Sequence, residues 1–260
     1  MRNLLILILA ALVGVAAMLV WLMVERDRGN GATTEPPIET AEVVEEAAPK
    51  PVPAPATATK PTPVLSEDEA KARRICMAGA ADGSLPDAGT LFGHYRYGDA
   101  DTALTSPPAG IKGGNCGLVT AGTAAALSAM LDAAKAENPD VAAAMRGISC
   151  HRSVARQAGL YCASGRIASR GYAGQARWVA PPGFSEHSTG YAIDFGDRNH
   201  PECDVSTCFK STPVGEWLAA NAGRFGFVLS FPAGNAQGVS YEPWHYRWQG
   251  DGVAQSKFAH

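Results

Sequence analysis

The chain has 260 residues, of which 46% are hydrophobic, and a formal net charge of −3 at pH 7. This length is sufficient to bury a sizeable core, and the near-neutral charge provides no broad basic surface, so we expect no nucleic-acid partner. The six cysteines form no CxxC pair, which argues against a structural zinc cluster of the ribbon type.

The N-terminal segment from Leu4 to Val24 contains no charged residue. As a helix rising about 1.5 Å per residue it would span about 30 Å, the hydrocarbon thickness of a bilayer. Val15-Ala16-Ala17 could serve as a signal-peptide cleavage site, but the apolar residues from Met18 to Val24 that follow it favour an uncleaved anchor. We therefore expect residues 1–28 to form a membrane anchor, either a signal-anchor or a signal peptide.

All six cysteines follow this segment, and an even number of cysteines in an exported chain favours disulfides. We therefore expect a single-pass protein of the cytoplasmic (inner) membrane, with its folded part facing the periplasm or the outside. Six thiols permit about 15 pairings. The pairs closest in sequence are favoured, namely Cys150–Cys162 and Cys203–Cys208, which leaves Cys76–Cys116.

Residues 29–65 are rich in proline, glutamate and alanine and contain no aromatic residue. Such a segment cannot bury enough apolar surface to offset its ordering entropy, so we expect a disordered linker. Residues 66–260 are expected to form one folded domain.

Within this domain the predicted helices come first and the predicted strands cluster late, which favours an α+β fold. The glycine and proline density between Arg166 and Gly183 predicts a long loop. The predicted helices are residues 66–79, 120–137, 153–163 and 213–222, and the predicted strands are residues 147–150, 191–195, 227–231 and 244–248.

The stretch SEHSTGYAIDFG begins at Ser185 and leads into the second predicted strand. Side chains alternate between the faces of a strand, so Tyr191, Ile193 and Phe195 would enter the core. Asp194 would project from the opposite face, which Gly190 and Ala192 leave clear of bulk. A turn before Gly190 could fold His187 back over that face, and histidine and carboxylate are both good zinc ligands.

A second stretch, YEPWHYRW, begins at Tyr241 and shows the same alternation. Its aromatic residues form one stripe, and His245 and Arg247 face the other way. Two histidines and one carboxylate as ligands would leave a fourth zinc position for water, which is the layout of a catalytic site. Glu242, nearby but unligated, could then act as the general base for that water.

The pattern S-x-H-x-x-G-x-A-x-D, followed by E-P-W-H, resembles the VanY-type D-alanyl-D-alanine carboxypeptidases. These belong to a zinc peptidase superfamily that includes lysostaphin-like enzymes and the hedgehog domain. The resemblance implies a hedgehog/D,D-peptidase-like domain, with flanking helices and a small antiparallel sheet that carries the site. It implies one Zn²⁺ bound by His187, Asp194 and His245, and Glu242 as the catalytic residue.

The same resemblance implies substrate contacts for Arg152, Ser153, Gln157 and Ser185. A planar guanidinium binds a terminal carboxylate bidentately, which makes Arg152 the candidate for recognising the end of the substrate. The expected activity is removal of the terminal D-Ala from peptidoglycan stem peptides that end in D-Ala-D-Ala, with the N-terminal helix as the contact to the membrane.

Two alternatives remain open from the sequence. One is a D,D-dipeptidase or a peptidoglycan endopeptidase that uses the same zinc site. The other is a non-catalytic, hedgehog-like cell-wall binding module, against which the presence of Glu242 argues. The sequence does not indicate the oligomeric state.

Overall fold

The computed structural model describes residues 65–80, 85–86 and 88–260. The predicted anchor, residues 1–28, and nearly all of the predicted linker, residues 29–65, lie outside these ranges. The domain boundaries therefore stay predictions.

No helix in the described ranges is long and apolar enough to cross a membrane. The longest of them, α3 (Ala121–Glu137), has 17 residues and includes Asp132 and Lys135. This finding contradicts the expected location as a single-pass protein of the cytoplasmic membrane, and the membrane contact expected with it. The segment on which that prediction rested, Leu4 to Val24, lies outside the described residues.

The centre of the fold is a four-stranded antiparallel sheet with the strand order β5-β6-β8-β7. The central pair, β6 and β8, places Asp194 directly opposite His245. The small antiparallel sheet of the predicted α+β fold is thus confirmed, with strand ends that differ from the predicted ones by a few residues. The strands are β5 (Met145–Ser149), β6 (Ala192–Asp197), β7 (Phe227–Leu229) and β8 (His245–Trp248).

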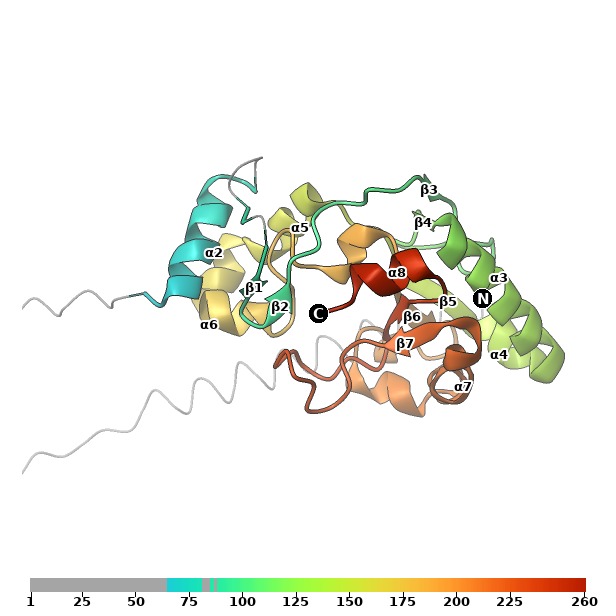
Figure 1. Ribbon diagram of the computed structural model, residues 1–260. Helices are drawn as coiled ribbons and strands as arrows, with labels where there is room; N and C mark the ends of the chain where they lie inside the picture. Colours follow the sequence, from blue (N-terminus) through green and yellow to red (C-terminus); the bar gives the residue numbers. More distant parts are fainter. Residues whose placement is uncertain (1–64, 81–84, 87) are drawn as a thin grey trace, which may run out of the picture. The chain divides into compact units, whose positions relative to one another are not determined.

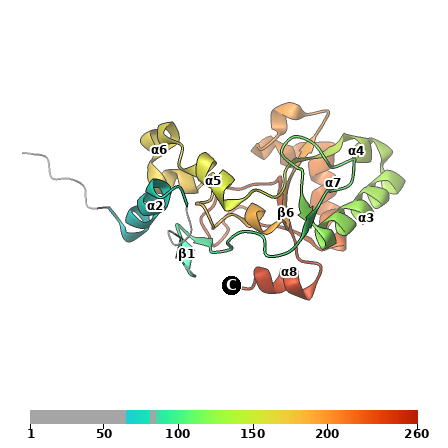
Figure 2. The same cartoon turned by 90° about the horizontal axis from the view of Figure 1, so that it is seen from above.

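Helices flank the sheet in two groups. In both views α2, α5 and α6 lie at one end of this folded part and α3, α4 and α7 at the other, with β6 between them (Figure 1, Figure 2). The remaining helices and strands are short. The helices are α2 (Glu67–Met77), α3, α4 (Pro139–Ala144), α5 (Val154–Tyr161), α6 (Ser164–Ala176), α7 (Pro213–Asn221) and α8 (Gly252–Lys257), with 3-10 turns η1 (Glu186–Thr189), η2 (Pro201–Cys203), η3 (Thr207–Ser211) and η4 (Ala222–Phe225) and two-residue strands β1 (Thr90–Leu91), β2 (His94–Tyr95), β3 (Leu104–Thr105) and β4 (Val119–Thr120).

Local sequence explains where several helices begin. Ser66 and Glu69 form a complete capping box at the start of α2, and the Ser153 hydroxyl accepts a hydrogen bond from the Arg156 amide at the start of α5. The four predicted helices are confirmed. The loop predicted between Arg166 and Gly183 is wrong, because most of it belongs to α6, which absorbs Gly171 as a kink with φ 68°.

The predicted strand faces are confirmed by the packing partners, since both faces of β6 are buried. Tyr191, Ile193 and Phe195 are buried in the main core, where they meet the buried stripe of Tyr246 and Trp248. Tyr191 stacks against Trp248 with ring centroids 6.3 Å apart, and the Phe195 ring packs edge-on to Tyr246 at 5.7 Å. This apolar face fixes the register of β6 and β8.

Two of the three predicted disulfides are wrong. The bonds join Cys76 to Cys162, Cys116 to Cys150, and Cys203 to Cys208, so that only the last pair agrees with the prediction. The pairing follows the tertiary structure, since α2 packs against α6, which follows Cys162, and Asn115 bridges to Ser149 beside Cys150. Proximity in the sequence was the wrong guide for both.

Candidate metal centre and substrate cavity

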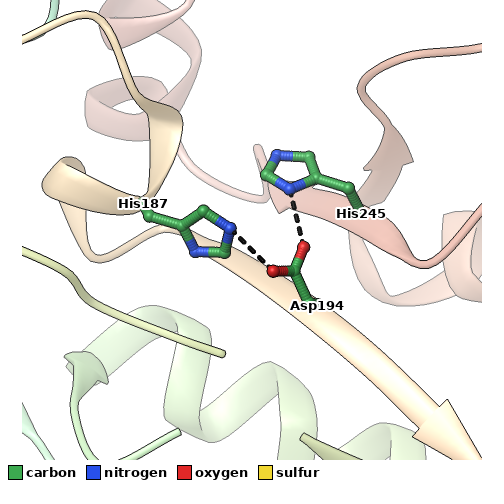
Figure 3. A group of neighbouring side chains, drawn as sticks. All are labelled: His187, Asp194 and His245. Atoms are coloured by element: carbon green, nitrogen blue, oxygen red, sulfur yellow. Dashed lines mark hydrogen bonds and ion pairs between the residues drawn. The ribbon is translucent and has the colours of Figure 1, made fainter. Parts of the chain in front are cut away.

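His187, Asp194 and His245 meet at one point of the structure (Figure 3). His187 comes from the turn η1, Asp194 from β6 and His245 from β8. One ligand-type atom from each side chain lies within 4.8 Å of the other two, and all three residues are buried. The structure thus brings together the three residues predicted as metal ligands.

The hydrogen bonding of His187 determines which ring nitrogen faces the centre. Its Nδ1 lies 2.8 Å from the carbonyl oxygen of Cys150, which can only accept, so Nδ1 carries the proton. Its Nε2 lies 3.1 Å from Oδ2 of Asp194. Burial lowers the pKa of His187 to about 4, so at neutral pH the imidazole is neutral and its Nε2 lone pair faces a carboxylate oxygen.

Two acceptor atoms held this close repel each other unless they share a cation. The second carboxylate oxygen, Oδ1 of Asp194, lies 2.8 Å from Nδ1 of His245. Two imidazole nitrogens and one carboxylate around one point form a donor set that suits a small divalent ion such as zinc. The arrangement fits a metal centre.

His245 has a second carboxylate partner on the far side of its ring. Its Nε2 lies 2.9 Å from Oε2 of Glu186, a residue that the sequence analysis did not single out. Burial alone would lower the pKa of His245, but the hydrogen bonds with Asp194 and Glu186 raise it to about 10 in the absence of a metal. A metal ion at the centre therefore has to replace a proton on Nδ1.

Glu242 lies next to the three ligand-type side chains without joining them. Its Oε2 is 4.0 Å from Nδ1 of His245. The His245 amide donates to the Glu242 carbonyl, so the turn that ends in β8 sets the spacing of the two residues. Burial raises the pKa of Glu242 to about 8, a value suited to a group that takes up and releases a proton near neutral pH.

Arg152 brings a cation to the same region. Its backbone amide donates to the carbonyl of His187 at 3.1 Å, which ties the arginine to the turn that carries this candidate ligand. Its guanidinium forms no ion pair with a carboxylate of the described residues, and its Nε has no hydrogen-bond partner among them. Desolvation lowers the pKa of Arg152, which is the cost of burying a guanidinium without a paired anion, and an anion in the cavity would offset that cost.

A cavity of about 290 Å³ opens onto the centre and is shared by these groups. Gln157 lines it, and its Nε2 donates to the Ala180 carbonyl at 2.6 Å while its Oε1 has no partner in the described part of the chain. The residues of the predicted site that line the cavity are Arg152, Gln157, Ser185, His187, Asp194, Glu242 and His245.

Ser153 is the exception. Its hydroxyl caps α5, and the residue does not line the cavity. The structure gives the Ser153 hydroxyl a role in starting the helix, and its predicted substrate contact stays a prediction.

Glu186 and Arg247 extend the hydrogen-bond network around His245; the sequence pointed to no role for Glu186 and left Arg247 without one. The Arg247 Nη1 lies 2.7 Å from Oε1 of Glu186, and both carboxylate oxygens of Glu186 are thereby occupied. One signal was present in the sequence, because Arg247 follows His245 by two residues and so shares its strand face. An acid directly beside His187 was a natural partner for that arginine.

Comparison with known proteins agrees with the geometry. Residues 118–251, about half of the chain, match the family model described as VanY, D-alanyl-D-alanine carboxypeptidase. These residues include every predicted site residue. The chain belongs to the VanY D-alanyl-D-alanine carboxypeptidase family.

Individual relatives match over stretches of similar length. The chain is 36% identical over 133 residues to YodJ of Bacillus subtilis (strain 168), which is 50% of this chain and 46% of the relative. It is 36% identical over 130 residues to a D-alanyl-D-alanine carboxypeptidase of Enterococcus faecalis, which is 48% of this chain and 46% of the relative. The match thus covers a little under half of the length of each of these curated relatives.

Two solved structures are also similar. The LdcB LD-carboxypeptidase is 30% identical with a TM-score of 0.47, over 63% of this chain and 74% of that chain. VanYB in complex with D-alanine-D-alanine is 28% identical with a TM-score of 0.45, over 60% of this chain and 82% of that chain.

Proposed function

We propose that the chain is a zinc-dependent D-alanyl-D-alanine carboxypeptidase that removes the terminal D-Ala from peptidoglycan stem peptides. The observation that carries the proposal is the unpaired guanidinium of Arg152, which shares one cavity with Glu242 and the three ligand-type side chains. Membership of the VanY family supports the same activity.

In this proposal His187, Asp194 and His245 hold one zinc ion. The ligand charges favour an electrophilic centre, since one carboxylate and two neutral imidazoles leave a net charge of about +1 on the complex. When bound, zinc acts as a Lewis acid that polarises the scissile carbonyl and lowers the pKa of a water molecule.

Arg152 orients the substrate. Its planar guanidinium donates two hydrogen bonds to the terminal carboxylate, which supplies the counter-ion that the described residues do not. The last peptide bond then lies beside Glu242. Gln157 offers its unpaired Oε1 to an amide N–H of the substrate, and Ser185 lines the same wall.

Glu242 moves the proton. Its carboxylate accepts a proton from the attacking water, whose oxygen bonds to the carbonyl carbon as the C–N bond breaks. The same carboxyl then delivers the proton to the departing amine of D-alanine. The products are free D-alanine and a peptide that is one residue shorter, and the raised pKa of Glu242 suits both transfers.

The test is incubation of the full-length chain with zinc and a pentapeptide ending in D-Ala-D-Ala, followed by mass spectrometry. Loss of one D-alanine, abolished by a chelator and restored by zinc, supports the proposal. Release of the dipeptide D-Ala-D-Ala or an internal cut would instead assign a dipeptidase or an endopeptidase. Absence of any cleavage by the zinc-loaded chain would leave a non-catalytic binding module and overturn the proposal.

A further inference from the structure

Glu186 is a buried carboxylate that the proposed reaction does not use. Its side chain is 1% exposed. Its Oε2 accepts hydrogen bonds from the Ser230 hydroxyl at 2.5 Å and from the His245 ring at 2.9 Å, and its Oε1 accepts one from Arg247 at 2.7 Å. A buried charge persists in a fold only when it is paired and hydrogen-bonded, and Glu186 is both.

These contacts connect separate parts of the site. Glu186 belongs to the turn that carries His187, Ser230 directly follows β7, and Arg247 lies two residues after His245 on β8. The Ser230 amide also donates to the His245 carbonyl, so the strand pair itself holds the partners of Glu186 in place. The position of the carboxylate is therefore set from three sides.

Figure 3 shows that the two histidines present different nitrogens to Asp194, Nε2 from His187 and Nδ1 from His245. In each ring the opposite nitrogen has a partner that can only accept. For His187 that partner is the neutral carbonyl of Cys150, whereas for His245 it is the carboxylate of Glu186. An anionic partner makes the ring a more basic, and hence stronger, metal ligand than a neutral partner does.

We propose that Glu186, held by Arg247, is the positioning residue of the metal centre. It accepts the Nε2 proton of His245, which fixes the tautomer that turns the Nδ1 lone pair toward the ion. Arg247 donates to the other carboxylate oxygen of Glu186 and so holds the carboxylate aimed at the ring. This inference rests on the proposed zinc centre, and it gives roles to two residues that are not among the three ligand-type side chains.

The first experiment measures zinc affinity of the full-length chain by competition with a chelator. Glu186→Gln keeps the size of the side chain but removes its charge. The amide has only one oxygen, so it can no longer accept hydrogen bonds from His245 and Arg247 on two separate oxygens. We expect its zinc dissociation constant to rise by about 10–100-fold. The matched control is Glu216→Gln on the exposed side of α7, which makes the same change of charge away from the site and should bind zinc as the parent does.

Kinetics at saturating zinc separate positioning from substrate binding. Glu186→Gln should lower kcat while KM for the pentapeptide stays near the parental value, because Arg152 is unchanged and the Glu186 side chain is only 1% exposed. Arg247→Gln should weaken zinc binding in the parent but have little further effect in the Glu186→Gln background, since it acts through Glu186. Independent, additive effects of the two substitutions would overturn the assignment.

A spectroscopic measurement identifies the nitrogen directly. In the zinc-loaded chain with ¹⁵N-labelled histidine, His245 should keep its proton on Nε2 and bind through Nδ1. Binding through Nε2 would overturn the inference, as would parental zinc affinity in Glu186→Gln. If Glu186→Gln does not fold, Ser230→Ala removes one hydrogen bond and keeps both charges, and it should weaken zinc binding by a smaller factor. A parent chain that binds no zinc would refute the proposed function itself.

Discussion

Asp194 and His245 are register partners in the central strand pair, and their side chains meet with Oδ1 and Nδ1 2.8 Å apart. Two of the three candidate ligands are thus brought together by the hydrogen-bonded ladder between β6 and β8. Residues directly opposite each other in an antiparallel pair have their Cβ atoms about 4.5–5.5 Å apart, which is the span that one small ion can bridge. His187 completes the set from the turn before β6.

Glu242 is expected to be essential for hydrolysis but not for metal binding. Glu242→Gln keeps the shape of the side chain and removes its ability to take up a proton, so turnover should fall by about 10²–10⁴-fold. Zinc affinity should stay at the parental value, because Glu242 is not among the three ligand-type side chains. Glu202→Gln, on an exposed side chain, is the matched control. Parental turnover in Glu242→Gln would contradict the proton-transfer role.

Arg152 is expected to bind the terminal carboxylate of the substrate. Arg152→Lys keeps the charge but loses the bidentate geometry, and KM should rise by about 10–100-fold, in line with about 1.5–3 kcal/mol for a charged hydrogen bond. A substrate with a C-terminal amide supplies the cross-check, since the substitution should hardly affect its cleavage. Arg170→Lys changes an exposed arginine of α6 outside the cavity lining, and it should leave KM unchanged for both substrates. Equal losses for both substrates would refute carboxylate recognition by Arg152.

The Cys116–Cys150 disulfide is expected to support the site as well as the fold, because the Cys150 carbonyl holds the His187 ring. Replacing both cysteines with serine should cost about 2–4 kcal/mol of unfolding free energy and should also weaken zinc binding. Serine at Cys76 and Cys162 gives the comparison. That bond closes a longer loop, and neither residue is a partner of the ligands, so stability should fall while zinc affinity changes little. Urea denaturation measures the stability of both variants, and chelator competition measures their zinc affinity. The same zinc affinity in both would contradict the connection between the Cys116–Cys150 disulfide and the metal centre.

The metal-free chain is expected to lose stability as the pH rises from about 6.5 to about 10. The pKa of His245 is raised from 6.5 to about 10, so its contribution is fully present below pH 6.5 and is lost as the pH rises through 10. Glu242, whose pKa is raised from 4.5 to about 8, acts in the same direction up to about pH 8. Below pH 6.5 the lowered pKa of His187, about 4, acts in the opposite direction, because there the unfolded chain binds the extra proton.

Urea unfolding of the metal-free chain at a series of pH values measures this dependence. The zinc-loaded chain is the comparison, and it should lose less stability over the same range, because the ion replaces the proton on His245. A metal-free chain whose stability is constant from pH 6.5 to pH 10 would contradict the charged network around His245.

The centre of the site was predictable because strand periodicity is a local property. Alternation alone assigned Ile193 and Asp194 to opposite faces, and the same argument turned His245 away from the aromatic stripe. The buried apolar partners then fix the register that sets Asp194 against His245. Helix starts were equally local, as the capping residues Ser66 and Ser153 illustrate.

The remaining features depend on contacts between distant segments. Glu186 reads as a solvated acid in a turn until Ser230 and Arg247, more than 40 residues away, enclose it. The disulfides of Cys76 and Cys116 depend in the same way on how helices and loops pack. In α6 the glycines suggested a loop, but packing against α2 stabilises a kinked helix in spite of their low helix propensity.

The hydrogen bond from the Arg152 amide to the His187 carbonyl sets the spacing of these two residues in the site. It joins, through the main chain, the residue that would grip the end of the substrate and the first ligand at the point of cleavage. The backbones of Arg152 and His187 are therefore held at a fixed separation, so that substitution of the Arg152 side chain would weaken substrate binding without moving the two backbones apart. A change in how many residues are removed would require an insertion or deletion between Ser149 and Val154 or around η1.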